Sequence, residues 1–132
     1  MRVVLDTNVL IAAFATRGIC EDVFRTVLAE HELVVSKFTL EELERVLVDK
    51  LKMSSARARA VTAFVRDVAE IVDPPEPAPW PENDRDDGWV VATAIVGEAQ
   101  FLVSGDRDLL GASKEAVPVE IVSPRGFWER LR

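Results

Sequence analysis

The chain has 132 residues, which predicts a single domain, 1–132, large enough to bury a hydrophobic core. A net charge of −7 argues against a general nucleic-acid-binding surface, though not against an enzyme whose acids gather at a metal site while arginines line the approach. The single cysteine excludes an intrachain disulfide framework and a cysteine-based zinc site. Because no apolar run resembles a secretory signal or is long enough to span a membrane, we expect a cytoplasmic protein with no membrane partner.

The first stretch with a chemical signature lies at residues 3–8. Residues 3–5 are typical of a short strand buried on both faces, and Asp6 comes where that strand should end. An apolar helix is predicted directly afterwards, over Val9–Phe14. This order places Asp6 at the carboxyl edge of a parallel sheet, where α/β folds bind their ligands. In the competing interpretation, Asp6 or Asn8 only caps the helix by accepting a backbone N–H.

Hydrophobic periodicity predicts the elements of the first half of the chain. They are a helix over about Ile19–His31, a strand over Leu33–Val35 ended by Ser36, a helix over about Thr39–Lys50, a helix from Ser54-Ser55 to about Glu70, and a very short strand at Ile71-Val72. The expected buried stripe of the third helix is Leu40, Leu43, Val46, Leu47 and Leu51, and that of the fourth is Ala60, Val61, Phe64, Val65 and Val68.

Three acids of the helix over 39–50 deserve comparison. On a helical wheel, Glu42 and Glu44 both border the apolar stripe, whereas Glu41 points away from it. Either Glu42 or Glu44 could therefore reach over an adjoining cleft, and periodicity does not choose between them. All three could equally be solvated acids of a helix surface.

A proline-dense segment over 74–81 must be extended, and we interpret it as a surface loop rather than a domain linker. It leads to the acidic run 82–87 and then to a helix over Trp89–Val96 that is apolar nearly all round and therefore predicted to be buried. Asp87 is in line with the apolar positions of this helix, while Asp84 belongs to the preceding turn. A helix dipole explains one or two acids here. Asp84, Asp86 and Asp87 are three acids within four residues, and their repulsion requires a compensating cation or raised pKa values.

The strand predicted over Phe101–Val103 repeats the pattern of Asp6. It ends in a polar turn, Ser104-Gly105-Asp106-Arg107-Asp108, for which an Asx turn is the competing interpretation. A last strand is predicted over Val119–Val122, and Ser123-Pro124 is typical of the start of a final helix, whose Phe127 and Trp128 would close the core.

The alternation of short apolar strands and helices predicts a three-layer α/β domain with a parallel sheet of four or five strands. In such a fold Asp6, Asp87 and Asp106 converge on one edge, and Glu42 can join them. Carboxylates that share a cleft are costly unless a cation or protonation intervenes. Oxygen ligands without His or Cys favour Mg²⁺ or Mn²⁺, and such ions can activate water and steady the leaving oxygen of a phosphodiester.

These motifs, taken in order, resemble the PIN domain, and more closely its branch of toxins related to VapC from toxin–antitoxin pairs. The residues that carry the resemblance are Asp6-Thr7-Asn8, Glu42-Leu43, Asp84-x-Asp86-Asp87, Ser104-Gly105-Asp106 with Arg107-Asp108-Leu109-Leu110, and Ser123-Pro124-Arg125-x-Phe127. The resemblance spans essentially the whole chain and implies an α/β/α PIN-like nuclease domain. It implies a Mg²⁺- or Mn²⁺-dependent endoribonuclease whose catalytic, metal-holding acids are Asp6, Glu42, Asp87 and Asp106, and so favours Glu42 over Glu44.

The resemblance also implies supporting residues and partners. Asn8, Ser104 and Asp108 would orient the site, and Asp84 and Asp86 would be auxiliary ligands; charge alone suggests Arg85 and Arg107 for phosphate contact. Hydrolysis would use metal-activated water rather than a protein nucleophile. The implied partners are RNA as substrate, a separate antitoxin protein and a second copy of the chain in a homodimer.

Two alternatives differ in kind. One is a PIN-like binding or scaffold module without catalysis, which the sequence leaves open. The other is a phosphatase of the haloacid dehalogenase type, which is disfavoured because Asn8 stands where the general acid should be and because Lys114 is the only lysine in the second half of the chain.

Overall fold

Five short strands form one parallel sheet at the centre of the computed structural model, which describes residues 1–79, 85–111 and 118–131, with only the backbone at residue 85. The order β3-β2-β1-β4-β5 places β1 in the middle, and every neighbouring pair is parallel. The strands are β1 (Arg2–Leu5), β2 (Glu32–Val35), β3 (Glu70–Ile71), β4 (Phe101–Val103) and β5 (Glu120–Val122). The predicted parallel sheet of four or five strands is therefore confirmed.

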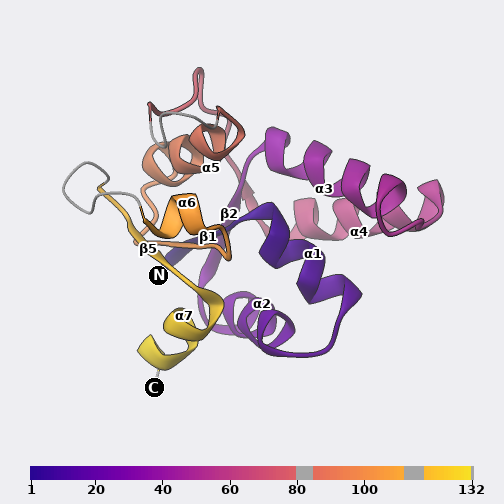
Figure 1. The fold of residues 1–132 in the computed structure, drawn as a ribbon, viewed down its shortest axis with the longest axis horizontal. Helices are drawn as coiled ribbons and strands as arrows, with labels where there is room; N and C mark the ends of the chain where they lie inside the picture. The colour runs from indigo at the N-terminus through magenta and orange to yellow at the C-terminus, as the bar shows by residue number, and fades with distance from the viewer. Residues whose placement is uncertain (80–84, 112–117, 132) are drawn as a thin grey trace.

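Helices cover both faces of the sheet (Figure 1). They are α1 (Thr7–Ala15), α2 (Ile19–Glu30), α3 (Lys37–Asp49), α4 (Ser55–Val68), α5 (Arg85–Val96), α6 (Arg107–Leu110) and α7 (Pro124–Arg130). Successive residues of a strand point to opposite faces, so Val3 and Leu5 join the core under α1–α4 and α7, while Val4 joins the core under α5 and α6. The chain thus has the three layers that its alternating pattern predicts.

Side-chain caps fix where most of the helices begin. Asp6 accepts the Thr7 N–H at 2.8 Å, Ser36 accepts the Thr39 N–H at 3.2 Å, Ser54 accepts the Arg57 N–H at 3.2 Å and Ser123 accepts the Gly126 N–H at 3.0 Å. Each cap satisfies an N–H that has no partner within its own helix. Because Asp6, Ser36 and Ser123 also follow strands directly, strand ends and helix starts meet at the same edge of the parallel sheet.

The predicted buried face of α4 is wrong by part of a turn. The structure buries Ala58, Thr62 and Val65, while Phe64 and Val68 remain 45% and 39% exposed. Ala60 is also exposed and Val61 is half-buried. The reason is that α4 packs against α3 through a contact that includes a polar side chain. The Thr62 hydroxyl is satisfied there by the Arg59 carbonyl of its own helix at 3.0 Å, so it can be buried in place of Phe64.

Smaller differences concern element ends. The helix predicted from Thr39 begins at Lys37, and Leu51, predicted to belong to its buried stripe, lies beyond its end and is 44% exposed. Phe127 is completely buried as predicted, and Trp128 is half-buried against the same core. Within the described residues, no helix combines the length and the apolar character needed to cross a lipid bilayer.

Candidate metal centre

Asp6 lies at the carboxyl edge of the central strand and is only 5% exposed. Its Oδ1 caps α1, whereas its Oδ2 accepts the Ser104 hydroxyl at 2.7 Å and the Asn8 amide Nδ2 at 3.4 Å. The capping interpretation of Asp6 is therefore correct for one oxygen only. The second oxygen is held in place by one side chain from the first turn of α1 and one from the end of β4.

Asp106 enters the same region from the neighbouring strand. Its Oδ1 accepts the backbone N–H groups of Asp108 at 2.8 Å and Leu109 at 3.4 Å, which is the predicted Asx-type turn and caps α6. Its own N–H donates to Ser104 Oγ at 2.9 Å. Ser104 is completely buried. Its hydroxyl connects Asp6 and Asp106, because it donates to the Asp6 carboxylate and accepts from the Asp106 N–H.

Asp87 brings a third acid from the first turn of α5 and is 8% exposed. Carboxylate oxygens of Asp87, Asp106 and Asp108 all lie within 4.8 Å of one another. This spacing allows one cation to contact all three, because Mg²⁺ and Ca²⁺ sit about 2.0–2.6 Å from oxygen ligands. The structure thus brings Asp108, which the resemblance assigned only an orienting role, into the cluster of possible ligands.

The structure distinguishes the glutamates of α3. Glu42 has a side chain that is 19% exposed, and its charge raises the pKa of Asp6, so it faces the acidic edge. Glu44 instead accepts the Thr62 hydroxyl of α4 at 3.4 Å, and Glu41 is exposed. The choice that the helical wheel left open is therefore made by the packing of α3 between α1 and α4.

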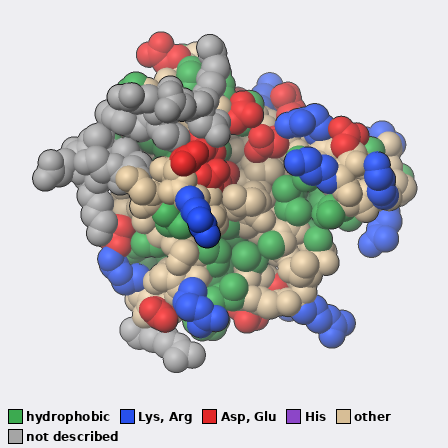
Figure 2. Space-filling view, in the orientation of Figure 1, with side chains coloured by type: hydrophobic (Ala, Val, Ile, Leu, Met, Phe, Trp, Pro, Cys, Tyr) green, Lys and Arg blue, Asp and Glu red, His purple; other side chains and the backbone are tan. Residues whose placement is uncertain are grey.

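Electrostatics at this edge favour a cation. Burial raises the pKa of Asp6, hydrogen bonds from Ser104 and Thr7 lower it, and the charges of Glu42 and Asp106 raise it again. Figure 2 shows acidic side chains gathered on this face between α5 and the start of α3. Hard oxygen donors that are partly withdrawn from water fit a divalent ion such as Mg²⁺ or Mn²⁺.

The remaining predicted site residues are either exposed near the acids or lie outside the described residues. Asn8 is exposed at the start of α1, and its Oδ1 accepts the Gly105 N–H at 3.4 Å. Asp86 and Arg107 are exposed on the first turns of α5 and α6. Asp84 and the side chain of Arg85 lie outside the described residues.

Sequence reasoning missed one feature of this region, which is a pocket beside the acids that is lined by Asn8, Val9, Cys20, Gly105 and Pro124. These residues come from four separate segments. No local spacing in the sequence could have grouped them.

The sequence and the fold were compared with known proteins. A family model described as PIN domain matches residues 2–108. No protein of curated function matches the sequence.

Several solved structures share the fold. VapBC2 from Rickettsia felis, bound to a DNA fragment from its promoter, contains a chain with 14% identity and a TM-score of 0.68, covering 93% of this chain and 98% of that one. VapBC-1 from nontypeable Haemophilus influenzae contains a chain with 16% identity and a TM-score of 0.68, and the match covers 95% of this chain and 99% of that one. FitAcB from Neisseria gonorrhoeae contains a chain with 17% identity and a TM-score of 0.62, and the match covers 93% of this chain and 98% of that one. At these identities the similarity is one of fold.

Proposed function

The chain belongs to the PIN domain family, and from this premise we propose that it is a Mg²⁺- or Mn²⁺-dependent endoribonuclease. One observation carries the proposal: Asp87, Asp106 and Asp108 offer oxygens within 4.8 Å of one another, beside a buried Asp6 whose pKa is raised by burial. Neighbouring carboxylates whose negative charges repel one another are typical of sites that bind a cation.

The proposed cation-holding residues are Asp6, Glu42, Asp87 and Asp106, and we add Asp108 to them on its geometry. When bound, a divalent cation would activate a water molecule for attack on phosphorus and would neutralise charge on the departing oxygen. The protein contributes the fixed arrangement of its acids. Ser104 is central to this arrangement, because its hydroxyl donates to Asp6 and accepts from the backbone of Asp106.

Supporting roles follow from the positions of the other polar residues. Asn8 donates to the oxygen of Asp6 that Ser104 also contacts, and so restrains that carboxylate from the side of α1. Arg107 is exposed next to Asp106 and could contact a phosphate of the substrate. Asp86 is exposed and directly precedes Asp87, and it is proposed as an auxiliary ligand. On sequence grounds alone, Asp84 is proposed as a second auxiliary ligand and Arg85 as a phosphate contact.

The biological setting is proposed from similarity. Chains with this fold occur in the VapBC2, VapBC-1 and FitAcB structures, and the motifs of this sequence resemble those of VapC-related toxins of toxin–antitoxin pairs. We propose that this chain is likewise the toxin of a type II toxin–antitoxin pair, restrained by a separate antitoxin protein. A homodimer and a cytoplasmic location belong to the same proposal.

The proposal is tested by incubating the purified protein with a mixed-sequence RNA in Mn²⁺, in EDTA and as the Asp87→Asn variant. Cleavage is expected only for the wild type in Mn²⁺, and because water is the nucleophile the products should lack 2′,3′-cyclic phosphate ends. Cleavage that persists in EDTA or in the variant would contradict the proposal, because it would need neither the metal nor Asp87. Calorimetric binding of Mn²⁺ without cleavage of any RNA would instead favour a binding module without catalysis.

A further inference from the structure

A pocket of about 300 Å³ opens next to the candidate metal centre. Its lining comes from the start of α1 (Asn8, Val9), the start of α2 (Cys20), the turn between β4 and α6 (Gly105) and the start of α7 (Pro124). In Figure 1 these segments meet below α6, between α1 and α7. We call this the Asn8–Cys20 pocket.

Asn8 and Gly105 connect the Asn8–Cys20 pocket to the acids. The Asn8 amide donates to Asp6 Oδ2, and its oxygen accepts from the Gly105 N–H, both at 3.4 Å. Gly105 immediately precedes Asp106. The lining of the pocket therefore includes the residue directly before Asp106 and a side chain hydrogen-bonded to Asp6.

The lining has the chemistry of a base-binding site. None of its five residues is charged, and three of them, Val9, Cys20 and Pro124, present apolar surface. Burial raises the pKa of the Cys20 thiol, which keeps it neutral at pH 7. Asn8 offers one donor and one acceptor, and its two long hydrogen bonds are weak enough to exchange for those of a ligand. An apolar floor with one amide at its rim suits a nucleobase, which has apolar faces and polar edges.

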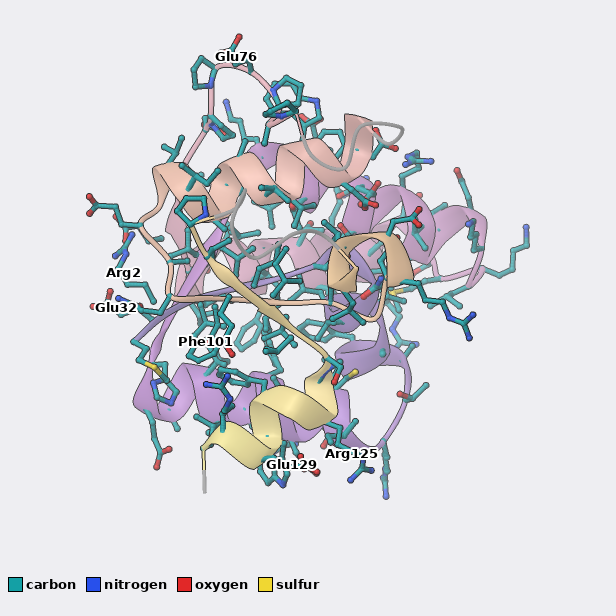
Figure 3. The ribbon with its side chains drawn as sticks, turned by 60° about the vertical axis from the view of Figure 1, so that its left-hand side comes forward. Arg2, Glu32, Glu76, Phe101, Arg125 and Glu129 are labelled. Atoms are coloured by element: carbon teal, nitrogen blue, oxygen red, sulfur yellow. The ribbon has the colours of Figure 1, made fainter. Side chains whose placement is uncertain are left out.

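A second pocket continues the path away from the acids. It has a volume of about 370 Å³ and is lined by Gly18, Ile19, Asp22, Arg125, Trp128 and Glu129. Two of its lining residues are sequence neighbours of residues that line the first pocket, since Ile19 adjoins Cys20 and Arg125 adjoins Pro124. Arg125 is exposed at the start of α7 (Figure 3) and forms no ion pair with a described side chain. Its guanidinium shares this pocket with the carboxylates of Asp22 and Glu129.

We propose that the Asn8–Cys20 pocket holds the base of the nucleotide next to the scissile phosphate. The inference rests on the proposed function and adds a specificity site to it. A single-stranded RNA is favoured over an acidic or basic peptide because the pocket of about 300 Å³ next to the proposed phosphate chemistry has no charged residue in its lining, which suits a base rather than a charged side chain.

The first test uses Cys20 as a reporter, since it is the only cysteine in the chain. The rate of its alkylation by iodoacetamide is measured at mildly alkaline pH. Ca²⁺ is the cation present, because oxygen ligands bind it. A short mixed-sequence oligoribonucleotide is expected to slow the reaction at least about fivefold, the scale of stacking one base on a protein side chain. The matched control is an abasic sugar–phosphate oligomer of the same length and charge, which should leave the rate unchanged.

The second test compares Cys20→Phe, which fills the pocket, with Cys20→Ser, which does not. Cleavage of a random-sequence RNA pool by Cys20→Phe should fall at least about fivefold in kcat/KM and lose its preference at the nucleotide flanking the cut. Mn²⁺ affinity, measured by calorimetry, should stay at the wild-type value in both variants. If Cys20→Phe does not fold, the alkylation test on the wild type still decides.

The outcomes separate this proposal from the proposed function. Cleavage without base-dependent protection of Cys20 overturns the pocket and leaves the nuclease intact. Protection by the oligoribonucleotide without cleavage supports the pocket as a nucleotide site while the nuclease proposal fails. Equal protection by the abasic oligomer overturns the pocket, since it would show that the backbone rather than a base approaches Cys20.

Discussion

Carboxylates gather at both ends of the sheet, but among the described residues the two ends differ in which of these carboxylates have an arginine as partner. At the amino end, the Arg2 guanidinium contacts Glu32 at 3.0 Å and also Glu70, and its Nε donates to the Gly97 carbonyl at 2.7 Å. Figure 3 shows Arg2 and Glu32 side by side. Hydrogen bonding with Glu70 raises the pKa of Arg2 further, so this end is permanently compensated.

At the carboxyl end the balance is different. No ion pair joins Asp6, Asp106 or Asp108 to a described Lys or Arg side chain. Asp6 is 5% exposed, whereas the Arg2 side chain at the other end is 26% exposed. Asp6 is thus both buried and without an ion pair to a described residue, and repulsion is screened least at such a position. Asp106 is half-buried, Asp108 is exposed, and Glu42 has Arg45 at 3.8 Å. The comparison shows that an arginine of the chain compensates the amino end, and it supports the proposal that the carboxyl end holds a cation.

The largest expected effect comes from Asp106→Asn at the carboxyl end. Asparagine keeps an oxygen that can accept the Asp108 and Leu109 N–H groups, so the cap of α6 is preserved while the charge is removed. Mn²⁺ affinity should fall at least about 100-fold, since even partners of metal ligands change affinity about 10–100-fold. Calorimetric titration measures this. Unchanged affinity would mean that Asp106 is only a cap.

A smaller effect is expected for Glu42→Gln, with Glu44→Gln as its matched control on the same helix. Glu42 faces Asp6, whereas Glu44 is bonded to Thr62. Glu42→Gln should weaken Mn²⁺ binding about tenfold, the lower part of the range for groups around a metal, and Glu44→Gln should leave it unchanged. Equal losses in the two variants would show that α3 contributes only general negative charge.

At the amino end, Arg2→Met keeps much of the apolar stem and removes the charge. Its two ion pairs are partly exposed, and its Nε–H···O bond is lost as well. The free energy of unfolding should fall by about 1–2 kcal/mol in a denaturant titration, with Mn²⁺ affinity unchanged. Arg25→Met, which breaks only the more exposed pair with Glu21, should cost less. A change in Mn²⁺ affinity would show that the two ends are not independent.

The smallest expected effect is a gain in stability from Asp6→Asn in the absence of metal. Because the pKa of folded Asp6 is raised above 3.8, its ionised form destabilises the fold above the folded-state pKa, and this penalty disappears as the pH falls below the unfolded value. The variant should therefore be more stable at neutral pH by about 0.5 kcal/mol, the scale of a relieved like-charge contact. The difference should vanish in acid.

Thermal unfolding of both proteins across the acidic range measures this effect, with the exposed Glu41→Gln as control. A less stable Asp6→Asn at neutral pH would contradict the prediction. It would mean that the bonds Asp6 accepts from Thr7 and Ser104 outweigh the repulsion from Glu42 and Asp106.

Much of the site could be predicted from the sequence because parallel strands end at one edge. Asp6 and the Ser104–Asp106 turn directly follow buried strands, so their approach to one another needed only the sheet. The same local logic gave the caps Ser36, Ser54 and Ser123, which depend on the backbone within three residues. The family resemblance added the choice of Glu42 over Glu44, which the helical wheel alone did not make.

The sequence by itself determined the order of elements, the parallel sheet and the acids that end its strands, because these follow from local periodicity and from caps. Only the tertiary structure decided which glutamate of α3 faces Asp6, that Asp108 lies with Asp87 and Asp106, and that α4 buries Thr62 rather than Phe64. The Asn8–Cys20 pocket also belongs to the tertiary structure. The physical reason is that a helical period defines a face relative to its own axis, while the neighbour that covers this face is set by packing between segments far apart in the chain.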